Sequence, residues 1–199
     1  IASSSGARTQ IVFVDTVTRS IVKRIASDQA RWLFMVSELA YSPDGRQLAM
    51  VGQSSVAYLL DVESEQKRQL AGHGGPRLYG LAFSADGHYL ATSGADRTVR
   101  IWQTADGALV QTLEIDANMA DDDWTTGLIF MRDDQWLVAA TAGFLNLWQR
   151  NNGDDGSVSY EHRWTERGHA DTIGRLVGDR SGDCIATVSF DQGVSVWRP

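Results

Sequence analysis

Two groups of residues contain the hydroxyl, imidazole and carboxylate side chains from which a nucleophilic catalytic triad could be built. In each group a threonine precedes an aspartate by four residues, and a tryptophan follows that aspartate by six. The sequence has no Gly-x-Ser-x-Gly motif to expose a nucleophile beside an oxyanion hole. A buried tryptophan needs an acceptor for its single N–H, so the repeated spacing favours a structural hydrogen-bond network over catalysis. The two groups are His73, Thr92, Asp96 and Trp102, and His169, Thr187, Asp191 and Trp197.

Two acidic segments are further candidates for chemistry. Asp121–Asp123 precede Trp124 in an extended connection, and no histidine accompanies them. Asn151–Gly156 is similar to part of a calcium-binding loop, but Gly153 falls at a ligand position and His162 at that of the bidentate glutamate. We interpret this second segment as a solvated loop. The sequence therefore predicts no metal site, no cofactor and no catalytic residue, and it contains no phosphate-binding Gly-x-x-x-x-Gly-Lys motif.

Composition excludes several other classes of protein. The 199 residues are 43% hydrophobic and carry a formal charge of −7, which disfavours binding to nucleic-acid phosphates or anionic lipid. No stretch approaches the 18 apolar residues of a membrane span. The single cysteine, Cys184, rules out an internal disulfide and fits a reducing compartment, so we expect a cytoplasmic protein.

The elements that must position these residues are revealed by an internal repeat. Shifting the chain by 42 positions aligns Leu39–Leu60 with Leu81–Trp102, with eight identities in 22 positions. Weaker copies span Leu128–Trp148 and Gly182–Trp197, and Ile11–Ile25 is similar to the end of a copy. The chain therefore contains four copies and a remnant.

Each copy predicts four short antiparallel strands. Apolar residues alternate with polar ones over four to six positions, and Asp-Gly pairs such as Asp86-Gly87 and Asp106-Gly107 mark tight turns. No segment shows an extended helical stripe. We predict one all-β unit over residues 1–199, with a partial copy at 1–25 and full copies at about 30–70, 71–113, 114–164 and 165–199.

The repeat length and the motifs Gly72-His73 and Gly168-His169, each followed by the Thr, Asp and Trp residues above, resemble those of the WD-repeat family. This family builds β-propellers. The resemblance implies that the tryptophan N–H donates to the threonine, which bonds the histidine, which in turn bonds the aspartate. Trp102 and Trp148 are followed by glutamine rather than by the family's aspartate. The copies that end at Leu60 and Trp148 lack a complete set of these residues.

The repeat count predicts an arc rather than a closed ring. Propellers usually close with four to eight blades, whereas this chain begins within a copy and ends after the third strand of another. We expect the C-terminal part of a larger, seven-bladed ring, completed by an upstream segment or by another chain. Isolated, such an arc would expose sheet edges.

The resemblance implies a non-catalytic scaffold or sensor that binds a protein or peptide on the propeller's top face. Large side chains of the types common at interface hot spots lie in connections on that face. Two alternatives stay open: a regulatory propeller fused to an upstream catalytic domain, and an enzyme that uses the channel mouth. The predicted binding residues are Arg31, Trp32, Arg77, Asp122 and Trp124.

Overall fold

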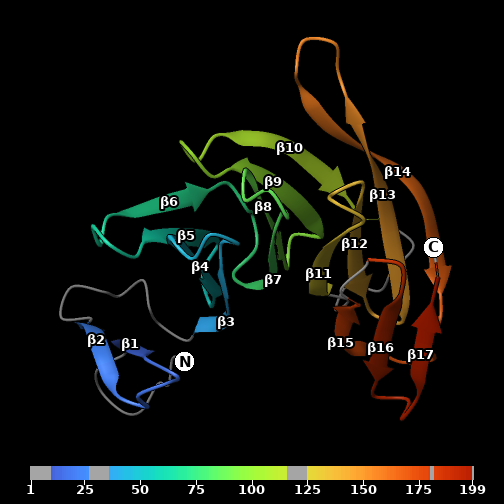
Figure 1. Cartoon of the computed structure of the whole chain (residues 1–199). Coiled ribbons are helices and arrows are strands. Elements are labelled where there is room, and N and C mark those ends of the chain that lie inside the picture. Colours follow the sequence, from blue (N-terminus) through green and yellow to red (C-terminus); the bar gives the residue numbers. More distant parts are fainter. Residues whose placement is uncertain (1–9, 27–35, 116–124, 180–181, 199) are drawn as a thin grey trace.

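The computed structural model describes residues 10–26, 36–115, 125–179 and 182–198 of the chain. Within these ranges the chain forms 17 β-strands and no helix. The strands make five antiparallel sheets that stand side by side in an open arc (Figure 1). The predicted all-β fold is therefore confirmed, and the arrangement is that of a partial β-propeller.

In every sheet, strands that are consecutive in the chain are hydrogen-bonded neighbours. Sheet 1 contains β1 (Gln10–Val14) and β2 (Ile21–Ala26). Sheet 2 contains β3 (Val36–Tyr41), β4 (Gln47–Gly52), β5 (Val56–Asp61) and β6 (Lys67–Ala71). Sheet 3 contains β7 (Leu78–Phe83), β8 (Tyr89–Gly94), β9 (Thr98–Gln103) and β10 (Leu109–Glu114). Sheet 4 contains β11 (Thr125–Met131), β12 (Trp136–Thr141), β13 (Phe144–Asn152) and β14 (Val158–Arg167). Sheet 5 contains β15 (Ile173–Gly178), β16 (Ile185–Ser189) and β17 (Val194–Trp197).

The tight turns follow from their residues. In the turn after β3, the Ser42 hydroxyl donates to Oδ1 of Asp44 (2.6 Å), and Gly45 adopts a φ of 72°. This left-handed conformation costs glycine little because it has no Cβ. The equivalent turn after β7 repeats the arrangement, with Ser84 donating to Asp86 (2.6 Å).

The corresponding turn of sheet 4 has a different conformation. Arg132, Asp133 and Asp134 are consecutive non-glycine residues with positive φ (50°, 50° and 67°). The Asp134 carboxylate reaches the neighbouring sheet, where it accepts the N–H of Ala85 (2.7 Å). This turn therefore joins sheets 3 and 4 by a hydrogen bond that involves no strand pairing.

The innermost strand of each of sheets 2 to 5 contains a bulge just after its first residue. Two of the bulged residues carry hydroxyls that bond the next sheet. Ser37 donates to the carbonyl of Leu78 (3.2 Å), and Thr126 donates to that of Ile173 (2.5 Å). These bonds link sheet 2 to sheet 3 and sheet 4 to sheet 5 close to the centre of the arc.

The hydrophobic core lies between the sheets. Alternation directs the apolar side chains of one strand toward both neighbouring sheets, so an internal sheet buries both of its faces. Residues that fill these layers include Phe13 and Met50 between sheets 1 and 2, Leu59 and Trp102 between sheets 2 and 3, Ile101 and Trp148 between sheets 3 and 4, and Leu147 and Ile185 between sheets 4 and 5.

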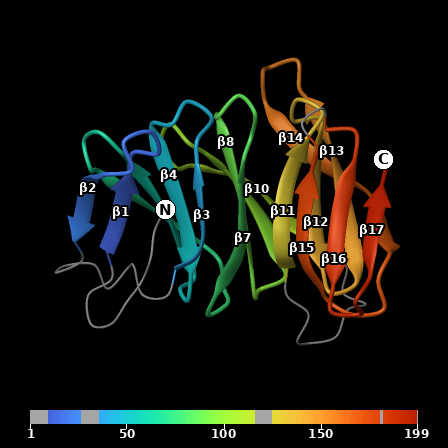
Figure 2. The same ribbon diagram turned by 60° about the horizontal axis from the view of Figure 1, so that its bottom comes forward.

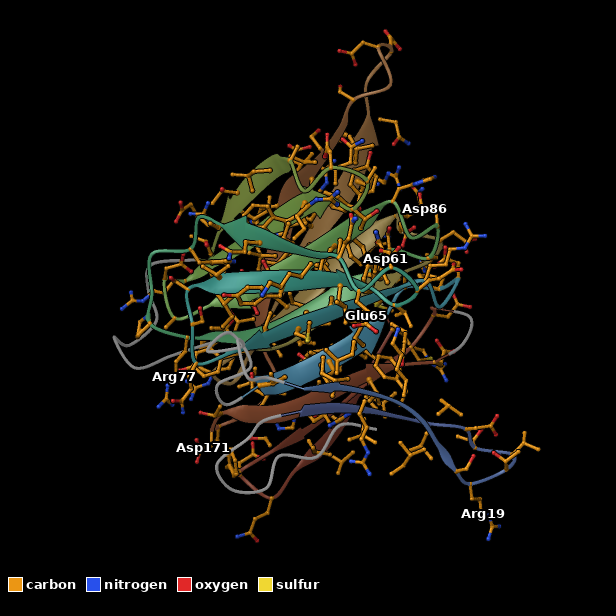
Figure 3. The ribbon with its side chains drawn as sticks, turned by 90° about the vertical axis from the view of Figure 1, so that its left-hand side faces the viewer. Arg19, Asp61, Glu65, Arg77, Asp86 and Asp171 are labelled. Atoms are coloured by element: carbon orange, nitrogen blue, oxygen red, sulfur yellow. The ribbon has the colours of Figure 1, made fainter. Side chains whose placement is uncertain are left out.

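The strands of all five sheets lie roughly along one axis and alternate in direction, so the turns gather at two opposite faces (Figure 2). Figure 3 separates these faces: Arg77 and Asp171 lie on one side, and Asp61 and Asp86 lie on the other. We call the first the connection face; its described residues are 53–55, 72–77, 95–97, 142–143, 168–172 and 190–193. We call the second the hairpin face; its described residues include 42–46, 62–66, 84–88, 104–108, 132–135 and 153–157.

Candidate functional site

The structure brings the four residues of the first group together in sheet 3. Trp102 Nε1 donates to Oγ1 of Thr92 (2.8 Å), which lies 2.9 Å from Nε2 of His73. Nδ1 of His73 lies 3.0 Å from both carboxylate oxygens of Asp96. Since Thr92 accepts the indole proton, its own proton can bond Nε2, and Nδ1–H then donates to Asp96. Every donor in this arrangement has an acceptor.

The second group forms the same network in sheet 5. Trp197 Nε1 donates to Thr187 Oγ1 (3.0 Å), and that hydroxyl lies 2.8 Å from Nε2 of His169. Nδ1 of His169 lies 3.1 Å from Oδ2 of Asp191. The glycine before His169 has a packing role, because a Cβ at Gly168 would overlap the Trp197 ring.

Each aspartate also anchors the connection that enters its sheet. Asp96 accepts the N–H of Gly74 (2.8 Å), and Asp191 accepts that of Ala170 (2.8 Å). Burial raises the pKa of Asp96, but the hydrogen bonds from His73 and Gly74 outweigh this effect and hold it far below its ordinary value. The Ala170 N–H is the main cause that lowers the pKa of Asp191. Both carboxylates therefore stay ionised as acceptors.

Burial determines what the two networks can do chemically. The Thr92 and Thr187 hydroxyls belong to almost fully buried residues, and each already bonds an indole and an imidazole. A substrate carbonyl could not approach either oxygen without displacing the tryptophan. The geometry is therefore that of a structural brace that ties the tryptophan of the third strand to the second strand and to the entering loop.

The predicted binding residues are only partly within the described chain. Arg31, Trp32, Asp122 and Trp124 lie outside the described residues. Arg77 is exposed on the connection face, immediately before β7, and Asp171 lies on the same face (Figure 3).

One exposed residue on this face was missed by sequence reasoning. Phe190 follows β16 in the turn that contains Asp191, and 73% of its surface is exposed. Its ring lies over the main chain of Gly174, since a Cβ there would be 3.8 Å from the ring. The equivalent residue of sheet 3 is Ala95, so a comparison of these two repeats would have shown phenylalanine at a position that holds a small residue in sheet 3.

Sheet 5 also presents an apolar surface to solvent. Val194 and Val196 of β17 are 71% and 68% exposed, whereas their equivalents in sheet 3, Val99 and Ile101, are fully buried against sheet 4. Val188 of β16 pairs with Val194 and is also exposed. We call these residues, with Val177 of β15, the open face.

Among the described residues, no group of three His, Cys, Asp or Glu side chains could hold a metal ion. The segment Asn151–Gly156 forms the end of the β13–β14 hairpin. The residues that the structure describes also contain no helix long and apolar enough to cross a membrane.

Radial four-stranded sheets, bulged inner strands and buried Trp–Thr–His–Asp networks together define a β-propeller repeat protein. Residues 64–103 match the family described as "WD domain, G-beta repeat". Residues of several WD-repeat proteins align with most of the chain, and the chain belongs to the WD-repeat family.

Three relatives illustrate this similarity. An uncharacterized WD repeat-containing protein, sll1491, of Synechocystis sp. is 31% identical over 135 residues, covering 67% of this chain and 36% of the relative. COMPASS component SWD3 of Saccharomyces cerevisiae is 21% identical over 190 residues, covering 94% and 58% respectively. Protein HIRA of Dictyostelium discoideum is 27% identical over 146 residues, covering 66% and 13%. The chain thus spans less than two thirds of each of these proteins.

Proposed function

We propose that this chain is a non-catalytic scaffold or sensor propeller that binds a protein or peptide partner on its connection face. The main support is a difference in exposure between two sets of polar and aromatic residues. The Thr, His, Asp and Trp side chains of the two networks bond one another in the interior, whereas Arg77 and Phe190 are exposed on a common face. A relative named as a COMPASS component is consistent with a role in assemblies.

The residue types on this face suit protein recognition. Arginine and large aromatic side chains contribute much of the binding energy at protein interfaces because they bury area and bond carboxylates or carbonyls. Phe190 is an apolar anchor of this kind, held by a turn that the Asp191 carboxylate braces through the N–H of Gly193 (2.7 Å). Trp32 and Trp124, with Arg31 and Asp122, complete the proposed binding set.

The test begins by placing a photo-cross-linking amino acid at position 77 in the full-length protein and identifying the attached partner. The purified partner is then titrated against wild type, Arg77→Ala/Phe190→Ser and Trp32→Ala/Trp124→Ala. We expect each double variant to weaken binding by roughly tenfold or more. Arg19→Ala, on the exposed turn between β1 and β2, should leave the affinity unchanged. Unchanged binding by both double variants would exclude the connection face.

We also propose that a further sheet, from another segment of the protein or from another chain, covers the open face and completes a seven-bladed ring. The support is the equivalence of Val194 and Val196 to residues that neighbouring sheets bury elsewhere. A hollow of about 220 Å³ between Trp164 and Trp197 lies beside the free edge of β17.

Amide hydrogen exchange tests this completion. The amides of β17 should exchange more slowly in the full-length protein or complex than in the 199-residue chain, because a neighbouring sheet would exclude water. Equal exchange in the two samples would contradict it. We place the protein in the cytoplasm, since its single cysteine suits a reducing compartment.

A further inference from the structure

Among the described residues, the hairpin formed by β13 and β14 is the longest. These strands have nine and ten residues, whereas the other strands have four to seven. The pairing of β12 with β13 ends at Gln149, and the Arg150 N–H donates to the Gln135 carbonyl (2.9 Å), so the hairpin continues beyond Arg150 without strand pairing to the rest of sheet 4. Figure 1 shows this part of the hairpin rising well beyond the neighbouring sheets. We call residues 150–158 the projecting hairpin.

A groove with a volume of about 350 Å³ separates the projecting hairpin from the adjacent corner of sheet 3. We call it the side groove. Tyr89 and Val158 give it an apolar floor, since both side chains pack on the core between sheets 3 and 4. Arg150 lies over the Tyr89 ring at 5.6 Å and donates through Nε to Asn152 (2.9 Å). Asp86 and His88 line the opposite wall.

The edge of β14 shows how this groove can bind main-chain groups. The Gln111 side chain of sheet 3 accepts the N–H of Tyr160 (2.7 Å) and donates to its carbonyl (2.9 Å). A paired β-strand would make the same two bonds, so an amide already occupies this edge at Tyr160.

The next outward-directed position on this edge is Val158, because outward and inward main-chain groups alternate along a strand. Val158 lines the side groove and pairs with Asn152, just as Tyr160 pairs with Arg150. The Gly153 N–H donates to the Ser157 carbonyl (2.8 Å), so residues 153 and 157 bond each other across the hairpin, and the Val158 N–H and carbonyl point away from β13. The edge thus offers one donor and one acceptor next to an open groove.

The charges around the groove determine which side chains suit it. Within the groove, the positive charge of Arg150 is opposed by the negative charge of Asp86, since both residues line it. The rim adds the exposed carboxylates Asp106, next to groove-lining Ala105, and Asp154 and Asp155, between groove-lining Asn152 and Gly156. The surroundings are therefore net negative.

We propose that the side groove binds an extended segment of a partner protein that carries lysine or arginine side chains and pairs through its main chain with Val158. Addition of an extended peptide to a sheet edge supplies affinity through main-chain bonds, while flanking side chains supply specificity. Here the carboxylates of the rim select basic residues, and the floor of Tyr89 and Val158 accepts an apolar one. This surface is separate from the connection face, so the two can be tested independently.

The experiment uses selection of a phage library of random dodecapeptides on the full chain. We expect enrichment of peptides in which lysine or arginine alternates with apolar residues, and the synthetic peptides should slow exchange of the Val158 amide. The test variant replaces Asn152–Val158 by Asn-Gly, a two-residue hairpin turn. It keeps the Asn151–Ser159 pair and the Gln111 bonds to Tyr160, and it should lose at least about tenfold in affinity.

Point variants keep the proposal testable if the shortened hairpin does not fold. Asp154→Asn/Asp155→Asn should weaken binding about two- to tenfold and reduce its dependence on salt. Asp44→Asn/Asp61→Asn makes the same charge change in turns of sheet 2 and should have no effect.

Four results would overturn the proposal. These are no enrichment above a selection without protein, a preference for acidic peptides, unchanged Val158 exchange, or equal binding by the shortened and wild-type chains.

Discussion

Replacing Thr92 by valine tests whether the buried network braces the propeller. Valine has nearly the shape of threonine and suits a β-strand, so the change removes a hydroxyl without opening a cavity. It leaves the Trp102 N–H and Nε2 of His73 without a partner in a site that excludes water.

The expected loss of stability follows from the two polar groups that lose their hydrogen-bond partner. A buried polar group without a partner costs about 1–3 kcal/mol, so the loss of two partners should lower the free energy of unfolding by about 2–6 kcal/mol. The same change at Thr187 should cost about 1–2 kcal/mol, because the Trp197 side chain is partly exposed and its N–H can reach water. Thr112→Val in β10 is the control and should stay within about 0.5 kcal/mol.

Urea unfolding, followed by tryptophan fluorescence, measures these differences through the midpoint at constant m. The expected order of destabilisation is Thr92→Val, then Thr187→Val, then Thr112→Val. If Thr92→Val costs no more than the control, the hydrogen bonds at Thr92 do not stabilise the fold, and the interpretation as a structural brace is wrong.

Three further changes probe the carboxylates and turns. The folded-state pKa of Asp96 lies below its ordinary value of 3.8, so the ionised carboxylate stabilises the fold above pH 3.8, and this stability is lost as the pH falls toward the folded-state pKa. Asp96→Asn should therefore lower Tm at neutral pH, and the Tm of the variant should decrease less than that of the wild type on acidification. Burial raises the pKa of Asp134, so the ionisation of this carboxyl group destabilises the fold as the pH rises. Asparagine also tolerates a φ of 67°. Asp134→Asn should therefore raise Tm near pH 7, but not at a pH below the ordinary carboxyl pKa. Gly182→Ala should lower the urea midpoint more than Gly45→Ala, because both have positive φ but only at Gly182 would a Cβ meet the main chain of Arg132, at 2.5 Å. Equal midpoints would show that the turn relaxes.

Much of the fold was predictable because its determinants are local. Alternation and Asp-Gly turns specify antiparallel strands, and the repeat of 42 residues specifies that similar sheets follow one another. The Thr-to-Asp and Asp-to-Trp spacings also lie within one hairpin and its turn. Strand register then brings Thr92 and Trp102 to hydrogen-bonding distance, with His73 arriving from the preceding connection.

The sequence predicted less about contacts between sheets. Asp134 was an ordinary turn residue in the sequence, yet its carboxylate bonds the main chain of Ala85 in the neighbouring sheet. Gln111 and Tyr160 lie 49 residues apart, and nothing in their types indicates that one would bond the other's main chain. Such bonds depend on the relative placement of two sheets, which no local pattern encodes.

The exposure of strand residues also could not be predicted from the local sequence pattern. Val194 and Val196 alternate with polar residues as Val99 and Ile101 do, and the pattern alone assigns all four to a packed face. The structure buries the pair in sheet 3 and exposes the pair in sheet 5, because within the described ranges only sheet 3 has a neighbouring sheet on that side. Local alternation thus determined that each segment is a strand with one apolar face. Whether that face is core or binding surface was decided by the sheets around it, since burial is a property of neighbours in space.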